Sequence, residues 1–363
     1  MSALLPMPRL RPALARAERG DGATSPDSAG RRELADAYGR VATDLRVSLT
    51  DRCNLRCTYC MPAEGLPWLA RDELLSDAET IRLVEIGVRL LGIGTVRLTG
   101  GEPLLRRGLE QLVADIAALR PRPVIALTTN GIGLATRAAA LAEAGLDRIN
   151  ISLDTLDRNT FKQLSRRDRL ADVLAGVSAA RAAGLRPVKI NTVLMRGIND
   201  REAPALLHWA MAEGVQLRFI EQMPLDAQHA WQRSEMVTAD EIRDRLSTTV
   251  ELEEDEADAR RRGSAPAELF RVGGTEHRVG IIASVTRPFC GACDRVRLTA
   301  DGQIRNCLFA RTESDLRTSL RSGASDEEIA DQWVVAVRGK RPGHGIDDPS
   351  FLQPDRPMSA IGG

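Results

Sequence analysis

The six cysteines of this chain stand in two groups of three near opposite ends of the sequence. The first group has the spacing C-x3-C-x2-C and comprises Cys53, Cys57 and Cys60. The second has the spacing C-x2-C-x13-C and comprises Cys290, Cys293 and Cys307. A disulfide framework suits a short secreted chain, and no secretory pattern is present, so both groups are interpreted as ligands of metal ions or iron-sulfur clusters.

The first group has the composition of an iron-sulfur site. Three thiolates on one short loop can hold three irons of a four-iron cluster and leave the fourth iron open to a chelating ligand. The alternatives are a structural zinc ion or three ordinary buried thiols. Zinc needs a fourth ligand at short spacing, and the nearest histidine in the sequence is His208, so the cluster is favoured.

The second group leaves two interpretations open. A Cys3His zinc site completed by His277 or His344 is one of them. The other is a second iron-sulfur cluster, because three thiols again lack a convincing fourth ligand. In that case the open iron of the second cluster is expected to bind a substrate.

The elements that must position these groups repeat one pattern. Short β-rich runs alternate with Ala- and Leu-rich helical stretches, two of which are residues 78–91 and 239–246. The spacing of roughly 25 to 40 residues between strand starts fits one strand and one crossover helix per unit, which predicts a parallel sheet. The expected strands are residues 46–49, 96–99, 124–128, 148–153, 188–193 and 217–220.

Two architectures fit about six such units, since a closed barrel of about eight leaves no room. One is an open, doubly wound sheet, and the other is an incomplete TIM-type barrel. We adopt the incomplete barrel, with a smaller C-terminal α+β domain that carries the second cysteine group. In either fold, ligands bind at the carboxyl ends of the strands, so the polar residues there are the candidates for the site.

The chain is expected to divide into five parts. They are a poorly ordered extension (1–40), the barrel (41–250), a charged linker (251–264), the second-cluster domain (265–340) and a Gly/Pro-rich tail (341–363). Within the second-cluster domain, three runs alternate like antiparallel strands and two are helical. The strands are expected at 269–272, 277–282 and 296–298, and the helices at 314–320 and 326–337.

Composition excludes several classes of protein. The chain of 363 residues is 43% apolar and 28% charged, and its fifty basic residues balance fifty acidic ones. A neutral chain with 3% aromatic residues is unlike a nucleic-acid-binding module with two zinc sites. No stretch approaches the ~18 consecutive apolar residues of a membrane span. We expect a cytoplasmic protein without nucleic-acid or membrane partners.

The first cysteine group, with Tyr59 before its last cysteine, resembles that of the radical S-adenosylmethionine (SAM) enzymes. The run Thr99-Gly100-Gly101-Glu102-Pro103 resembles the glycine-rich element of that superfamily. The resemblance implies that SAM chelates the open iron and is cleaved to a 5′-deoxyadenosyl radical. It also implies contacts to SAM, in which Glu102 takes up the amino group, Ser152 and Asp154 bind the ribose or methionine part, and Met223 packs on adenine. The expected cofactor-binding residues are Tyr59, Gly101, Glu102, Ser152 and Met223.

The second group is followed by Asp294-Arg295-Val296-Arg297, and the chain ends in Gly362-Gly363. With the first group, these features resemble the GTP 3′,8-cyclase family of molybdenum cofactor biosynthesis, from about Thr43 to Gly363. The resemblance implies two [4Fe-4S] clusters, abstraction of the ribose 3′ hydrogen of GTP, and formation of (8S)-3′,8-cyclo-7,8-dihydro-GTP. The second cluster then holds guanine, and Gly362 and Gly363 enter the active site as catalytic residues.

The resemblance also implies partners. They are a low-potential electron donor such as flavodoxin or ferredoxin and a pterin-forming enzyme downstream; a homodimer is a further expectation. The competing interpretation is another radical SAM enzyme whose auxiliary cluster serves a peptide or a different small molecule. Such enzymes usually carry longer, more cysteine-rich tails than this chain has.

A neutral protein that binds GTP must meet the triphosphate with locally placed cations. Lys189 is the most informative candidate, because a lysine inside a parallel strand is costly to bury unless it points into a polar cavity. Arg295 and Arg297 share one face of a strand, although an exposed edge with salt bridges has the same spacing. The expected substrate-binding residues are Arg46, Arg97, Thr128, Lys189, Arg295, Val296 and Arg297.

Overall fold

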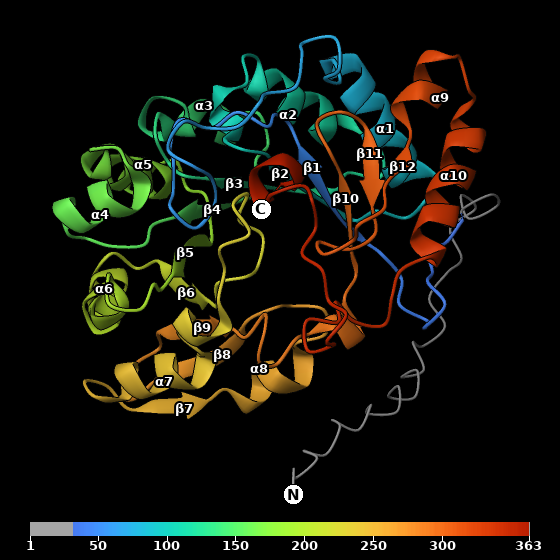
Figure 1. Cartoon of the computed structure of the whole chain (residues 1–363). Coiled ribbons are helices and arrows are strands. Elements are labelled where there is room, and N and C mark those ends of the chain that lie inside the picture. Colours follow the sequence, from blue (N-terminus) through green and yellow to red (C-terminus); the bar gives the residue numbers. More distant parts are fainter. Residues whose placement is uncertain (1–31, 363) are drawn as a thin grey trace, which may run out of the picture.

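One twelve-stranded sheet runs through the computed structural model, which describes residues 32–362 (Figure 1). Its strand order is β12-β11-β10-β1-β2-β3-β4-β5-β6-β9-β8-β7. The strands are β1 (Asp44–Ser48), β2 (Thr95–Thr99), β3 (Val124–Thr129), β4 (Arg148–Ser152), β5 (Val188–Val193), β6 (Gln216–Ile220), β7 (Leu252–Glu254), β8 (Glu268–Val272), β9 (Arg278–Ile282), β10 (Arg295–Leu298), β11 (Gln303–Arg305) and β12 (Ser314–Asp315).

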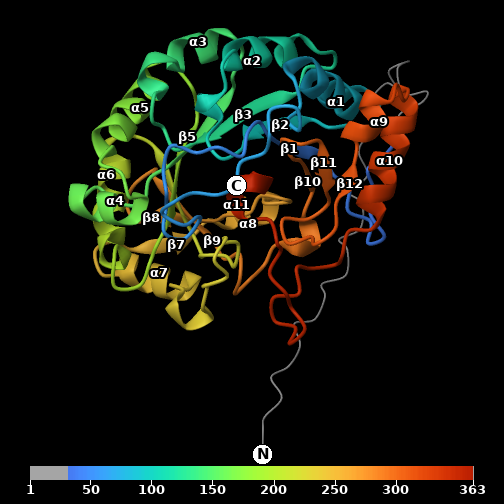
Figure 2. The same cartoon turned by 45° about the horizontal axis from the view of Figure 1, so that its top comes forward.

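Helices cover the outside of the curved sheet, as Figure 2 shows. The first of them illustrates why they form: Ser76 and Glu79 make a capping box at its start, and it buries a stripe that includes Leu83 and Val84. The helices are α1 (Asp77–Arg89), α2 (Leu109–Ala118), α3 (Ala138–Glu143), α4 (Arg158–Ser165), α5 (Leu170–Ala182), α6 (Ala203–Ala212), α7 (Ala239–Ser247), α8 (Glu256–Arg261), α9 (Arg317–Arg321), α10 (Asp326–Arg338) and α11 (Met358–Ile361).

The expected fold class, an incomplete barrel of parallel strands, is confirmed. Strands β1 to β6 pair in parallel in sequence order. The C-terminal part then extends both edges, because β9 pairs in parallel with β6 and β10 pairs in parallel with β1. Among the described residues no pairing joins β7 to β12, so the barrel stays open between them.

Two expectations for the C-terminal half are wrong. The run 251–264 is not a plain linker, because β7 pairs with β8 at the sheet edge and Asp255 caps α8. The run is rich in charged residues because β7, at the sheet edge, and α8 face solvent. The run 314–320 is not one helix, because β12 pairs with β11 before α9 begins. The antiparallel reading holds for β8 with β9, whereas β9 and β10 pair in parallel with the barrel strands.

The N-terminal boundary also lies earlier than expected. Residues 1–31 of the predicted extension lie outside the described residues, but residues 32–40 pack on the barrel. Leu34 is fully buried, and Arg32 N donates to Leu90 O at 2.8 Å. Arg40 donates to Cys290 O at 2.7 Å, so this segment supports the second cysteine group. These contacts are long-range and leave no periodic signal in the sequence.

The C-terminal tail turns back into the barrel, where Figure 2 places α11 near the centre. Met358 N donates to Leu225 O at 3.0 Å, and Ile361 at the end of α11 is 1% exposed. The tail therefore has a fixed place in the core. None of the helices in the described part of the chain is both long and apolar enough to cross a membrane.

Candidate functional site

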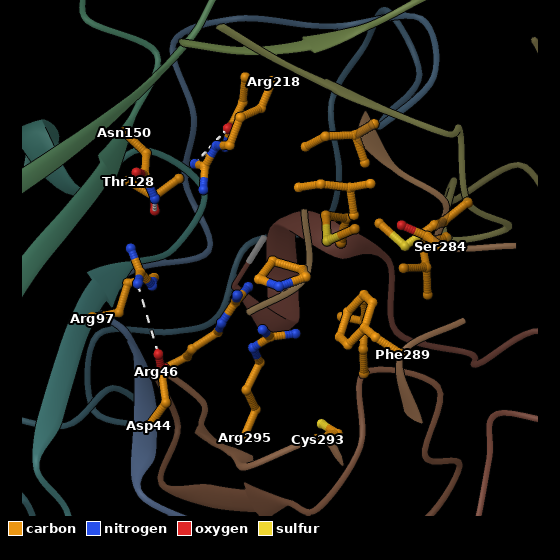
Figure 3. A pocket seen from close by; sticks show the side chains of 18 of the residues that line it. Asp44, Arg46, Arg97, Thr128, Asn150, Arg218, Ser284, Phe289, Cys293 and Arg295 are labelled. Carbon is orange, nitrogen blue, oxygen red and sulfur yellow. Dashed lines mark hydrogen bonds and ion pairs between the residues drawn. The ribbon is translucent and has the colours of Figure 1, made fainter. Parts of the chain in front are cut away.

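A cavity of about 550 Å³ inside the barrel is lined by residues of both cysteine groups, and Figure 3 shows part of its wall. Alternate residues of the central strands face it, because successive side chains of a strand point to opposite faces. Cys60 of the first group and all three cysteines of the second line its wall. The inward-facing strand residues are Asp44, Arg46, Thr95, Arg97, Thr128, Arg148, Asn150, Ser152, Lys189, Asn191, Val193, Arg218, Ile220, Arg295 and Arg297.

The first cysteine group lies on the loop that follows β1, and its thiols are free. Leu55 N donates to the Cys53 sulfur at 3.5 Å, and Arg56 donates to Cys53 O at 2.6 Å. Burial raises the pKa of the Cys57 thiol well above its ordinary value and that of Cys60 to about 12. Three part-buried thiols with raised pKa values become stable thiolates when a cation binds them, so this donor set fits an iron-sulfur cluster.

The glycine-rich element after β2 is shaped by the cysteine loop. Gly100 has φ +148°, and a Cβ on it would lie 2.5 Å from Thr50 O. A Cβ on Gly101 would lie 2.3 Å from Arg52 O. Both residues must therefore be glycine for the end of β2 to approach the chain that leads into Cys53. The close contacts that exclude a side chain at these two positions come from the backbone oxygens of Thr50 and Arg52.

Glu102 was expected to take up the amino group of SAM, but its side chain does not face the cavity. Its carboxylate is fully buried and accepts from Leu104 N at 2.9 Å, Thr129 Oγ1 at 2.6 Å and Asn130 N at 2.7 Å. It does not line the cavity. Burial raises the pKa of Glu102 to about 7. Glu102 therefore ties the glycine-rich element to the end of β3.

The other expected SAM contacts, apart from Gly101, line the same cavity as Cys60. Tyr59, Ser152, Asp154 and Met223 all line the cavity. The Tyr59 hydroxyl donates to Asp154 Oδ2 at 2.7 Å, and Val193 N donates to Asp154 Oδ1 at 2.9 Å. Burial raises the pKa of Asp154 to about 6. This cluster offers hydroxyls, a carboxylate and a thioether to one ligand.

Seven cationic side chains from the strands line the cavity together with Arg262, which follows α8, and several of the seven point toward its centre in Figure 3. They are Arg46, Arg97, Arg148, Lys189, Arg218, Arg295 and Arg297. Burial and the neighbouring guanidinium groups lower the pKa of Lys189 to about 8 and that of Arg218 to about 9. Asp44 lies 3.7 Å from Arg97 as an ion-pair partner. The cationic side chains repel one another, and a polyanionic ligand would relieve this repulsion.

Sequence reasoning missed Arg148 and Arg218. Arg218 lies inside β6 as Lys189 lies inside β5, so the argument that a strand cation must face a polar cavity applies to it equally. Its guanidinium donates to Asn191 Oδ1 at 2.7 Å. Arg148 opens β4, where a cation at a strand start usually faces solvent, and no local signal identifies it.

Val296 was expected to contact the substrate, but its side chain does not line the cavity. It is 1% exposed and belongs to the hydrophobic core. Because successive residues of β10 alternate, Arg295 and Arg297 face the cavity while Val296 faces the core. Thr128 does line the cavity, where Asn150 Nδ2 donates to its hydroxyl at 3.3 Å.

All three residues of the second cysteine group line the cavity. Its thiols are free, and the guanidinium of Arg295 lies 4.6 Å from the ring centre of Phe289, directly before Cys290. Within the described chain, no group of three or more His, Cys, Asp or Glu side chains closes around a single metal ion. A four-iron cluster needs no such closure, since each thiolate binds a different iron.

Gly362 lies against the strands that carry the glycine-rich element. It has φ +80°, and a Cβ on it would lie 2.7 Å from Thr99 Cγ2 and 3.3 Å from Ser48 Cβ. Its carbonyl oxygen accepts a hydrogen bond from Arg297. Gly363 lies outside the described residues. The tail thus reaches one of the cationic side chains of the cavity.

Comparison with known sequences gives matches along nearly the whole chain. The Radical SAM superfamily model matches residues 47–210, and the Molybdenum Cofactor Synthesis C model matches residues 215–346. The GTP 3′,8-cyclase of Streptomyces coelicolor is 65% identical over 334 residues, 92% of this chain and 97% of that protein. The GTP 3′,8-cyclase of Mycolicibacterium smegmatis is 61% identical over 336 residues, 91% of this chain and 92% of that protein.

Solved structures resemble the fold. Streptococcus suis SuiB, bound to its precursor peptide SuiA, aligns with a TM-score of 0.59 at 13% identity, over 83% of this chain and 67% of that one. The protein anSMEcpe, with bound AdoMet and a peptide, aligns with a TM-score of 0.51 at 15% identity, over 83% and 81%. At these identities the likeness concerns the barrel alone.

Proposed function

The chain belongs to the GTP 3′,8-cyclase family of radical SAM enzymes, and we propose that its cavity binds SAM at one end and GTP at the other. The reaction is conversion of GTP to (8S)-3′,8-cyclo-7,8-dihydro-GTP in molybdenum cofactor biosynthesis. When bound, the first cluster with SAM supplies a 5′-deoxyadenosyl radical that removes the ribose 3′ hydrogen. The observation that carries the proposal is one cavity that joins both cysteine groups through a ring of cations.

The first cysteine group is assigned to a [4Fe-4S] cluster and the surrounding side chains to SAM. Tyr59, Ser152, Asp154 and Met223 line the cavity beside Cys60. The Asp154 carboxylate is oriented by the Tyr59 hydroxyl, so it is held ready to accept from the ribose hydroxyls or the amino group of SAM. The Glu102 carboxylate accepts hydrogen bonds from Leu104, Thr129 and Asn130. We therefore assign the role of the SAM-binding carboxylate to Asp154, which lines the cavity.

The cationic middle of the cavity is assigned to the triphosphate. Guanidinium groups bind phosphate oxygens with two parallel hydrogen bonds, and seven converging cations compensate an anion that the neutral chain would otherwise not attract. Lys189 and Arg218 come from adjacent strands, β5 and β6, and Arg295 and Arg297 come from β10 across the cavity. In the proposed arrangement the ribose lies between the two cysteine groups.

The second cysteine group is assigned to a second [4Fe-4S] cluster whose open iron holds guanine. Its three thiols face the cavity, and Phe289 and His344 line the wall beside them. An aromatic side chain and an open iron together suit a purine base. A low-potential carrier such as flavodoxin or ferredoxin is proposed as the electron donor, and a pterin-forming enzyme as the consumer of the product.

Deuterium transfer tests this function. The anaerobically reconstituted protein is supplied with SAM, dithionite and GTP that carries deuterium at ribose carbon 3′. The expected result is 5′-deoxyadenosine with one deuterium and a product with a bond between carbons 3′ and 8. SAM cleavage that is independent of GTP, with no deuterium in the 5′-deoxyadenosine, would contradict the proposal and point to another substrate.

A further inference from the structure

Only three of the fifty basic residues of the chain are lysines, and they are Lys162, Lys189 and Lys340. Lys162 is exposed on α4, and Lys189 lines the cavity. Lys340 follows α10 after Gly339 and is 4% exposed. In a chain that uses arginine almost everywhere, a buried lysine indicates a place where a compact ammonium is required.

The contacts of Lys340 use all three of its N–H donors. Its Nζ donates to Cys293 O at 3.1 Å, to Arg295 O at 2.9 Å and to the Cys293 sulfur at 3.3 Å. Of these three acceptors, only the Cys293 sulfur can carry a negative charge. A buried ammonium is costly unless an anion compensates it, so its geometry fits a Cys293 thiolate.

Lys340 is held at the end of a well-anchored helix. Ser325 and Glu328 form a capping box at the start of α10, and Trp333 in its middle is fully buried. Lys340 N donates to Val337 O at 3.0 Å, and Asn306 Nδ2, beside Cys307, donates to Ala336 O at 2.8 Å. The last turn of α10 therefore contacts two of the three cysteine segments of the second group.

We propose that Lys340 positions the Cys293 ligand and compensates the charge of the cluster held by the second cysteine group. The inference rests on the proposed second cluster. Reduction of a [4Fe-4S] cluster adds one electron and therefore one negative charge. A fixed ammonium that donates a hydrogen bond to a ligand sulfur stabilises the reduced form and raises the reduction potential.

The first test is a reduction potential. A background with Cys53, Cys57 and Cys60 replaced by Ala leaves the second cluster as the only one, and dithionite-poised samples are followed by EPR. Lys340→Met is expected to lower the ratio of reduced to oxidised cluster at a fixed potential at least tenfold, which is a shift of about 59 mV for one electron. Lys340→Arg should restore part of the shift, and the exposed control Lys162→Met should leave the potential unchanged.

The second test needs no variant of Lys340. Lysine labelled with 15N at Nζ is incorporated into the same background with Lys189→Arg, so that Lys340 is the only labelled lysine near the second group. Pulsed EPR of the reduced cluster is expected to show a 15N coupling. An unchanged potential in Lys340→Met at full iron content, or no 15N coupling, would overturn the role of Lys340. Absence of any four-iron signal in the background alone would overturn the second cluster itself.

Discussion

The two cysteine groups have the same number of ligands in contrasting surroundings. Around the first group, burial dominates and raises the pKa of all three thiols. Around the second, burial likewise raises the pKa of Cys290, whereas at Cys293 Lys340 and Arg295 outweigh burial and lower the pKa. The first group is backed by the glycine-rich element and by Asn130, whereas the second opens onto the cations of the cavity. The difference suits one group to radical generation and the other to holding an anionic substrate.

Removal of the first group should have the largest effect. Replacement of Cys53, Cys57 or Cys60 by Ala is expected to abolish 5′-deoxyadenosine formation, because no other thiol lies beside the proposed SAM contacts. The measurement is the yield of 5′-deoxyadenosine together with iron content. Wild-type yield, with iron reduced by about four per chain, would mean that the two groups have been assigned in reverse.

Removal of the second group should separate two activities that are normally coupled. Replacement of Cys290, Cys293 or Cys307 by Ala is expected to leave some SAM cleavage while the cyclic product disappears. The first group is distant along the chain and makes its own contacts, so it should still load. Zinc in place of iron after anaerobic purification of the wild type would contradict the assignment of this group.

The C-terminal tail connects the two regions, and its alteration should act on turnover alone. Gly362→Ala places a Cβ 2.7 Å from Thr99 Cγ2 at a φ of +80°. A misplacement of about 1 Å can cost about a hundredfold in rate, and cyclisation is expected to fall by that order. Product is compared at matched iron content. Unchanged product from a chain lacking Gly362 and Gly363 would mean that the tail is dispensable, and a peptide of its last residues should otherwise restore activity.

Substitution of the cations should weaken substrate binding without affecting the clusters. Arg295→Ala and Lys189→Met are each expected to cost about 1.5 to 3 kcal/mol in GTP affinity, or about tenfold to a hundredfold. The matched control is Arg260→Ala, whose side chain is 71% exposed on α8. GTP affinity is measured by anaerobic equilibrium binding. Normal binding by Arg295→Ala would place this guanidinium outside the triphosphate site.

The smallest expected effect concerns stability around the first group. The folded state holds a proton on Glu102 up to about pH 7, whereas the unfolded state releases it near 4.5. Folded protein therefore binds more protons between these values, and the free energy of unfolding should fall as pH rises through this window, by at most about 3 kcal/mol. Glu102→Gln should remove this slope in denaturant titrations at several pH values. An identical slope in both proteins would exclude Glu102 as its source.

The parts of this molecule that could be predicted from sequence are those with a local signal. Both cysteine groups, the six central strands and the inward-facing Lys189 follow from spacing and periodicity. The roles of Glu102 and Val296 could not be predicted in the same way, because they depend on which face or neighbour a side chain meets in the fold. The charged run 251–264 resembles a linker until β8 pairs with it.

Long-range contacts account for the remaining differences. Leu34 and Arg40 look like parts of a loose extension, and only the folded barrel supplies the partners that bury them. Lys340 is an isolated lysine in the sequence, and its proposed role is inferred from its hydrogen bonds to the carbonyl oxygen and the sulfur of Cys293. In each case the informative contact joins residues far apart in the chain.

The central claim is that the first cysteine group serves SAM and the second serves GTP, and the wild-type protein tests it most directly. EPR spectra of the reduced, anaerobically reconstituted chain are recorded alone, with SAM and with GTP. The account predicts two cluster signals, one that changes only with SAM and one that changes only with GTP. A single signal that responds to both ligands, or a GTP response that survives removal of Cys290, Cys293 and Cys307, would contradict it.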